Sequence, residues 1–227
     1  MKISISWLQE KNACPDGIEW FRKKYSEQLE GVEYQSILDD LGKENKREWA
    51  EWLLSNAGST NDTLEIEGDL ILEHSIFFAG SIKVSNNIFV SGDVTAGGAV
   101  TAGWTVKAGG DVKAGGSVTA GGAVTAVGDV KAGWSVTAGG SVTAVGDVKA
   151  GGAVTAGGAV TAGWTVKAGG SVKAGWAVTA GGDVKAGGDY GIYVGLSVRV
   201  SQKVQYAIVY SKTRPENLIL GEWKEMK

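Results

Sequence analysis

Side chains able to do acid–base or nucleophilic chemistry are scarce in this chain of 227 residues, which has one histidine, His74, and one cysteine, Cys14. A general base must lie within hydrogen-bond reach of the group it serves, and no second catalytic group accompanies His74 beside Ser75. A histidine at a surface or corner is the simpler interpretation. Cys14, next to Pro15, could be a reactive thiol near a helix start, but we expect a small buried residue.

Metal and phosphate chemistry have no motif in the sequence. One cysteine and one histidine cannot close a metal site. The chain has 36 glycines, but its glycine-rich stretch lacks the G-x-x-x-x-G-K-[ST] phosphate loop and does not pass from a strand into a helix. We therefore expect no catalytic residue, no metal site and no cofactor, and a protein that is not an enzyme.

Tryptophan is the residue type best placed to recognise a partner. Four tryptophans occupy positions in the glycine-rich region that are otherwise Gly: Trp104, Trp134, Trp164 and Trp176. A core position rarely alternates between no side chain and the largest one, so we expect these side chains to point outward. Exposed tryptophans would be candidate anchors for a protein or carbohydrate partner. The alternative is that they fold inward and fill space beside small Ala residues.

A six-residue repeat must position these tryptophans. Apolar residues recur at every sixth position from Leu64 to Leu196, including Tyr190, and a second apolar series runs two positions later from Ile66 to Val198. Between them stands Thr or Lys in every repeat from 95 to 185. This alternation predicts a short strand with its first and third side chains buried and the middle one exposed. Glycine, which usually follows, lets the chain turn a corner.

Six residues are too few for a strand and its return, so each repeat must be one side of a coil that stacks on its neighbours. We therefore expect a mainly β fold, a parallel β-solenoid with three sides of six residues per coil. Two sides per coil would also fit. The 23 repeats predict about seven to eight three-sided coils.

The chain divides into three predicted parts. Residues 1–58 show helical spacing of apolar residues and should form a helical domain of three helices, with Gly31, Gly42 and Gly58 at ends or turns. Residues 59–198 form the solenoid, and residues 199–227 form a C-terminal β cap. Because the end segments should cover unpaired strands, a homo-oligomer is compatible with the sequence but an open filament is not expected.

Charge narrows the classes of partner. The net charge is −3, and residues 1–92 contain 16 acidic and 9 basic residues, which favours a basic protein partner that contacts residues 1–92. No segment has the basic excess of a nucleic-acid binder. Five aspartates stand two residues before a Thr or Lys of the repeat and should form exposed pairs with little effect on stability: Asp93, Asp111, Asp129, Asp147 and Asp183.

Targeting signals are not visible in the sequence. The N-terminal residues lack the apolar run of a signal peptide. No apolar stretch of about 18 residues occurs, so we expect no membrane-spanning segment and a cytoplasmic protein.

With these residues laid out, the repeat V-x-A-G, preceded by L-x-I-E, L-x-L-E and I-x-V-S, resembles the hexapeptide of left-handed β-helix proteins. Here Ala stands at the place usually held by Leu, Ile or Val. The run GDVTAGGAVTAG also looks like the repeats of bactofilins, which are right-handed, polymer-forming bacterial proteins, so the resemblances leave the handedness open. The segments at 13–21 and 47–54 are similar to N-terminal segments of bacterial and prophage-borne repeat proteins.

These resemblances imply different functions. Many left-handed β-helix proteins are acyltransferases with a catalytic histidine, whereas bactofilins self-assemble. The leading expectation from the residues is a non-enzymatic interaction or scaffold protein, of which a prophage-type accessory or inhibitor protein is one variant. The alternatives are a bactofilin-like structural protein and, least favoured, an acyltransferase that relies on His74.

Overall fold

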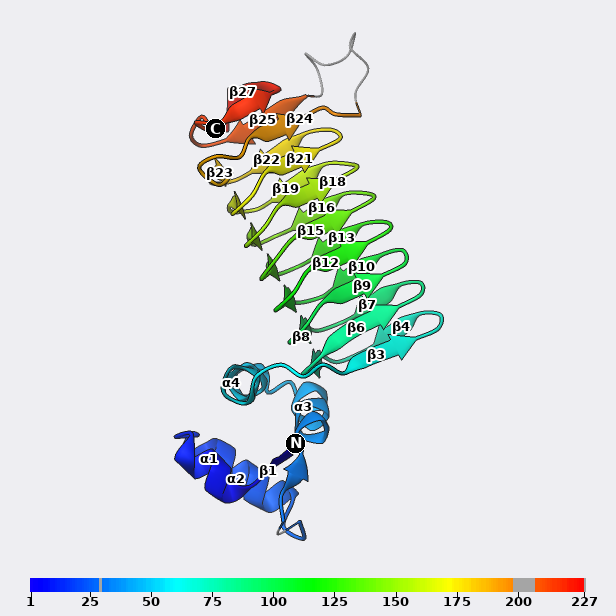
Figure 1. Ribbon diagram of the computed structural model, residues 1–227, viewed down its shortest axis with the longest axis vertical. Coiled ribbons are helices and arrows are strands. Elements are labelled where there is room, and N and C mark those ends of the chain that lie inside the picture. Colours follow the sequence, from blue (N-terminus) through cyan, green and yellow to red (C-terminus); the bar gives the residue numbers. More distant parts are fainter. Residues whose placement is uncertain (29, 198–206, 227) are drawn as a thin grey trace.

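The computed structural model describes residues 1–28, 30–197 and 207–226, and it shows a β-solenoid rod with a helical domain at one end (Figure 1). Among these residues, three parallel sheets run along the rod, with nine, seven and nine strands. We call them sheets I, II and III in the order in which the chain first visits them. The predicted mainly β, three-sided solenoid is confirmed, and its roughly nine coils exceed the seven to eight expected because C-terminal strands extend two of the sheets.

Sheet I contains β3 (Thr63–Ile66), β6 (Ser81–Val84), β9 (Val100–Ala102), β12 (Val118–Ala120), β15 (Val136–Ala138), β18 (Val154–Ala156), β21 (Val172–Ala174), β24 (Ile192–Val194) and β26 (Leu218–Leu220). Sheet II contains β4 (Leu70–Leu72), β7 (Ile88–Val90), β10 (Val106–Ala108), β13 (Val124–Ala126), β16 (Val142–Ala144), β19 (Val160–Ala162), β22 (Val178–Ala180), β25 (Ile208–Ser211) and β27 (Glu222–Glu225). Sheet III contains β5 (Ile76–Phe78), β8 (Val94–Ala96), β11 (Val112–Ala114), β14 (Val130–Ala132), β17 (Val148–Ala150), β20 (Val166–Ala168) and β23 (Val184–Lys185).

The described part of residues 1–58 forms four helices: α1 (Ile5–Glu10), α2 (Pro15–Lys24), α3 (Tyr34–Lys43) and α4 (Arg47–Ala57). The prediction of three helices was wrong. Helix α1 is only six residues long, and a segment this short is not stable as an isolated helix. The Ser4 side chain caps it by accepting a hydrogen bond from Trp7 N–H. A two-stranded antiparallel ladder, β1 (Lys2–Ile3) with β2 (Val32–Glu33), ties the two helix pairs together.

Each coil of the regular rod contains 18 residues. Val106 pairs with Val124, Lys107 with Thr125 and Ala108 with Ala126, and the same offset recurs along the rod. The repeat Val and Ala side chains form one continuous buried core, while Lys107 is exposed and Thr101 is half-buried. The predicted inward and outward positions are therefore confirmed for the regular repeat.

The six-residue register slips at the far end of the rod. Val172 of β21 pairs with Ile192 of β24, which lies 20 residues later. The prediction of an unbroken repeat with Tyr190 and Leu196 inside was wrong, because the two additional residues shift the strand, and both side chains are exposed. Val198, placed in the second apolar series, lies outside the described residues. The predicted β cap is seen as β25, β26 and β27, which stack in parallel on sheets I and II.

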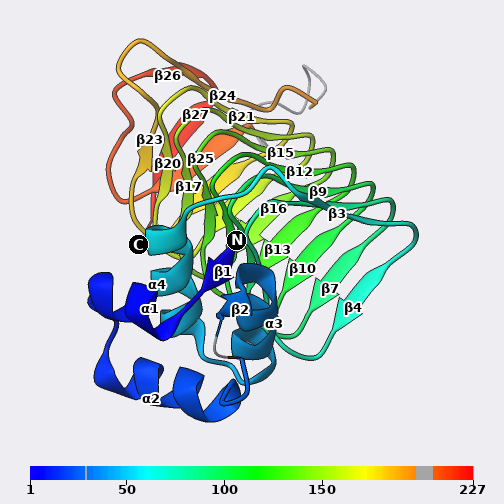
Figure 2. The same cartoon turned by 60° about the horizontal axis from the view of Figure 1, so that its bottom comes forward.

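The helical domain covers only part of its end of the rod. Helix α3 packs against β5, the first strand of sheet III (Figure 2). Strands β3 and β4 pair on one side only, and the inward residues Leu64 and Leu72 are half-buried. The expectation of no open filament assumed that the end segments cover all the unpaired strands of the rod. It therefore stays a prediction, to be checked by measuring the oligomeric state in solution.

Phe77 and Gly42 fasten α3 to the rod. Phe77 stands at the outward position of β5 yet is 1% exposed, because it packs into the core of the helical domain. Gly42 is the second-last residue of α3, near a helix end as the sequence suggested. A β-carbon at Gly42 would lie 2.5 Å from the Ser75 carbonyl oxygen, so only glycine permits this approach.

The attachment predicts a specific effect of Phe77→Thr, which restores the outward residue type of the regular repeat. We expect it to lower the free energy of unfolding of the helical domain by about 3 kcal/mol, because a buried aromatic ring is lost. Denaturant unfolding followed by tryptophan fluorescence measures this. Phe89→Thr, at the half-buried outward position of β7, is the matched control. An equal loss of stability in both variants would contradict the assignment.

Candidate protein-interaction site on the helical domain

An apolar cavity lies within the helical domain. It has a volume of about 410 Å³ and opens between α1, α2 and α4. Three half-buried tryptophans line it, Trp20 from α2 and Trp49 and Trp52 from α4, with buried Leu8 and Phe21 at its base. A concave, aromatic-lined cavity of this size is typical of a binding site.

The sequence explains why these side chains face one cavity. Trp49 and Trp52 are three residues apart on α4 and therefore lie on one face of that helix. Pro15 starts α2 as predicted, and Cys14 is its N-cap residue. The ring centroids of Trp20 and Trp49 are 5.9 Å apart, a spacing at which aromatic pairs are favourable.

Polar groups stand around the cavity. Glu48 and Cys14 are in its lining. The Trp20 indole N–H donates to Glu44 at 2.8 Å, and Lys24 donates to the same carboxylate at 2.9 Å. These two hydrogen bonds, that from Lys24 foremost, hold the pKa of Glu44 below its usual value. The tryptophan position is thus fixed by a carboxylate that stays charged at neutral pH.

Cys14 is exposed and forms no disulfide in the described chain. The prediction of a buried residue was wrong, because the N-cap residue of α2 lies at the opening of the cavity. His74 is half-buried at a corner of the first coil, where its Nδ1 lies 2.9 Å from the Ser75 carbonyl oxygen. Among the described residues, no second catalytic side chain forms a hydrogen bond with His74.

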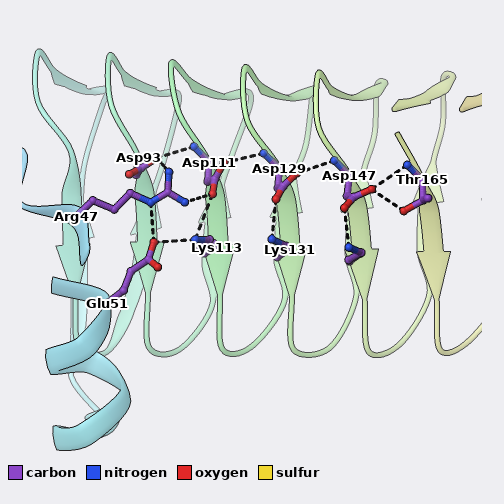
Figure 3. Close-up of polar contacts among 10 residues, drawn as sticks. Arg47, Glu51, Asp93, Asp111, Lys113, Asp129, Lys131, Asp147 and Thr165 are labelled. Carbon is purple, nitrogen blue, oxygen red and sulfur yellow. Dashed lines mark hydrogen bonds and ion pairs between the residues drawn. The ribbon is translucent and has the colours of Figure 1, made fainter. Parts of the chain in front are cut away.

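The junction between the domain and the rod is an ion cluster (Figure 3). Arg47 of α4 donates to Asp93 and Asp111 at the edge of sheet III, and also to Glu51 at 2.8 Å. Lys113 of β11 donates to Glu51 at 2.7 Å. Asp93 and Asp111 are buried beneath α4, so the prediction that all the repeat aspartates form exposed pairs was wrong for these two.

The aspartates also link successive coils. Asp111 accepts the N–H of Asp129 at 2.8 Å, Asp129 accepts that of Asp147 at 2.7 Å, and Asp147 accepts that of Thr165 at 2.9 Å (Figure 3). Their second oxygens bind lysines within the same coil, as in the 2.6 Å contact of Asp129 with Lys131. Each carboxylate therefore satisfies a corner N–H and neutralises a lysine.

The four repeat tryptophans point outward, as predicted, with exposed fractions between 52% and 72%. Trp104 and Trp176 follow strands of sheet I, Trp164 follows a strand of sheet II and Trp134 follows a strand of sheet III. They are therefore spread over all three edges of the rod and do not form one site. Their role in binding stays a prediction.

Sequence reasoning missed Arg47, Glu51 and Phe77. A signal for Phe77 was present, since an aromatic residue occupies an outward position where the later repeats have Thr or Lys. Arg47 and Glu51 are four residues apart and so lie on one face of a helix, but nothing in their spacing indicates which strands that face meets.

The ion cluster predicts a dependence on pH. Burial opposes ionisation of Asp111, but hydrogen bonds from Asp129 N–H and Lys113, with the charge of Arg47, lower its pKa below 3.8. Burial opposes ionisation of Glu51 as well, but Lys113 and Arg47 lower its pKa below 4.5. Groups with lowered pKa values stabilise the fold above their unfolded values and lose this effect as the pH falls through the folded ones.

We therefore expect the domain attachment to weaken as the pH falls below about 4.5. Hydrogen exchange of α3 and α4 at pH 6 and pH 3, corrected for intrinsic rates, measures this. Arg47→Gln should reduce the difference between the two pH values, whereas Lys83→Gln, which removes the exposed pair with Glu65, should not. The same pH dependence in wild type and Arg47→Gln would refute the role of the cluster.

Comparison with known proteins identifies one part of the chain. Residues 1–61 match the family model of the YdhT N-terminal domain. Neither curated proteins nor solved structures give a match. Within the described residues, no helix is long and apolar enough to cross a membrane, and no group of three or more His, Cys, Asp or Glu side chains could hold a metal ion. The helical domain is thus similar to the YdhT N-terminal domain, and the β-solenoid and the matched domain fit a repeat β-helix protein with a scaffold or interaction role.

Proposed function

We propose that this protein is a non-enzymatic interaction protein, in which a rigid β-solenoid holds a helical domain that binds a protein partner. The observation that carries the proposal is the open, tryptophan-lined cavity between α1, α2 and α4. A buried aromatic anchor from a partner fits such a cavity, because binding energy in protein interfaces is concentrated in a few large side chains that enter pockets.

The partner is a basic protein that contacts residues 1–92. This stretch has 16 acidic and 9 basic residues, and Glu48 lies in the cavity lining. Five acidic residues and no Lys or Arg occur in residues 59–78, the first coil beside the domain. Complementary charge of this kind speeds association and makes it sensitive to salt.

The rod and the helical domain differ in how varied their surfaces are, which is why we assign recognition to the helical domain. Most coils of the rod present the same outward residues, so the rod offers less variety for recognition than the helical domain does. The helical domain has a varied surface, and Phe77, Arg47 and Glu51 fix it to the rod. A rod that holds one recognition domain suits an accessory or inhibitor protein, which is the variant we favour in view of the similarity of segments 13–21 and 47–54 to prophage-borne proteins.

Self-assembly is the second candidate function. The edge strands β3 and β4 at one end and β26 and β27 at the other each pair on one side only in the described chain. Edge strands of this kind can pair with another copy. An acyltransferase is the weakest candidate, because His74 contacts a backbone carbonyl of its own neighbour and has no catalytic companion in the described chain.

The single cysteine gives a direct test of the cavity. Cys14 is exposed at its opening, so a bulky thiol reagent would obstruct entry without any substitution. We expect labelled full-length protein to capture its partner from the source cell at least about tenfold less well, since a tenfold loss corresponds to only about 1.4 kcal/mol. Binding should also weaken as salt is raised.

Two controls make the result specific. A methylthio group on Cys14 modifies the same atom with little volume and should leave capture unchanged. The variant with Trp104 and Trp176, which follow strands of sheet I, changed to Ala should also bind normally. Normal capture by the bulky-labelled protein would refute the cavity, and loss of capture by the tryptophan variant would move the site to the rod. Filaments in micrographs of wild-type protein would favour self-assembly.

A further inference from the structure

The charged residues of sheet III that α4 binds recur two coils further along the rod. The way α4 binds shows what a helix-docking unit requires. Arg47 binds Asp93 and Asp111, which stand at the start of neighbouring strands, and Glu51 binds Lys113, two residues after Asp111. Four residues of helix rise about 6 Å, and two residues of strand span about 6.6 Å. An Arg-x-x-x-Glu helix therefore matches an Asp-x-Lys strand when the helix runs along the strand direction.

Helix α4 has this orientation. It lies across the rod, seen nearly end-on in Figure 1 and roughly along the strands of sheet III in Figure 3. The same set of side chains recurs 36 residues further along the chain. Asp129 and Asp147 stand where Asp93 and Asp111 stand in the first unit, and Lys149 stands in the place of Lys113.

The spacing of the two units suits a pair of packed helices. Two coils separate them, which is about 9.6 Å at the usual distance between strands. Packed helices lie 8–10 Å apart. A groove of about 720 Å³ runs along sheet III beside α4, with Glu51, Leu54 and Ser55 as one wall and the Lys-Ala-Gly segments of successive coils as its floor.

Exposed apolar residues flank this unit. In the regular repeat six corner positions hold Val or Trp in place of Gly, and four of them border sheet III in the coils from β13 to β20: Val127, Trp134, Val145 and Trp164. All four are at least 60% exposed. Trp104 and Trp176 lie on the opposite edge. Apolar side chains on both sides of a charged track are the arrangement of an interface with buried anchors.

The chain offers only one such additional unit. A complete unit needs aspartates in two consecutive coils, and Thr165 interrupts the series between Asp147 and Asp183. Asp111 already binds Arg47. Among the aspartates and the outward strand residues, the second unit differs from the first at one position, because Lys131 replaces Thr95, which is buried beneath α4.

We propose that Asp129, Asp147 and Lys149 form a docking site for an amphipathic helix of a partner protein, which would lie beside α4. This helix presents Arg and Glu four residues apart, as α4 does, and a further acidic residue opposite Lys131. The site is separate from the cavity of the helical domain, and it binds one helix per chain.

A peptide of residues 46–58, held helical by a staple on the face away from Arg47 and Glu51, is the probe. Full-length protein should bind it saturably with one site. The variant Asp129→Asn, Asp147→Asn, Lys149→Gln should bind about tenfold more weakly, since exposed ion pairs contribute modestly each. Asn keeps the acceptor for the corner N–H groups, so the rod should stay folded.

Further changes test the geometry. Lys131→Thr gives the second unit the same aspartates and outward strand residues as the first and should tighten binding of the peptide. Asp183→Asn with Lys185→Gln alters an Asp-x-Lys pair that has no aspartate in the preceding coil. This variant should bind the peptide like wild type. Trp134→Ala should weaken binding, whereas Trp104→Ala, on the other edge, should not. Failure to bind at millimolar peptide, unchanged binding by the triple variant, or equal binding of a peptide with Arg47→Glu and Glu51→Arg would overturn the proposal.

Discussion

The rod from β3 to β23 depends on the superposition of each coil on the one before it, 18 residues earlier. Parallel strands pair residue for residue, and the corner N–H groups donate to carbonyl groups of the preceding coil, as Gly121 does to Ala102. A side chain that suits one coil must therefore suit the backbone of the next. The core accepts only Val and Ala over most of its length because three strands face one another around a narrow interior.

Rows of identical side-chain contacts along the rod follow from the same superposition of coils. Residues 18 positions apart have equivalent surroundings, so a useful contact in one coil is available in the next. Asp111, Asp129 and Asp147 at the entry to sheet III show this most clearly, because each accepts a corner N–H from the following coil while it binds a lysine of its own coil. Thr and Lys on the outward positions tolerate repetition because they stand in solvent or are neutralised by their neighbours.

The candidate binding residues of this protein lie where the sequence departs from the regular repeat. Phe77 and Thr95 lie on the outer face of sheet III but are buried, because the helical domain packs there. Val127, Val145 and Trp164 replace corner glycines along one edge of the same sheet. Sheet III is thus the side of the rod on which the helical domain packs and which four of the six exposed Val and Trp corner residues of the regular repeat border. The cavity of the helical domain and the track on sheet III lie on either side of α4, which makes this helix the centre of the candidate binding region.

The sequence by itself determined the architecture of the rod. A strict six-residue period with apolar residues two positions apart admits few folds, so the three-sided solenoid, its inward Val and Ala and its outward tryptophans could all be predicted. The tertiary structure decided what the period does not encode. Contacts between residues distant in sequence decide which face of the rod the helical domain covers. They also bury Asp93 and Asp111 and place Cys14 at the opening of a cavity. The repeat has the same local pattern in every coil and can therefore be recognised in the sequence. The docking of α3 and α4 occurs at one place, through Gly42, Phe77 and Arg47, so it produces no periodic pattern from which it could be predicted.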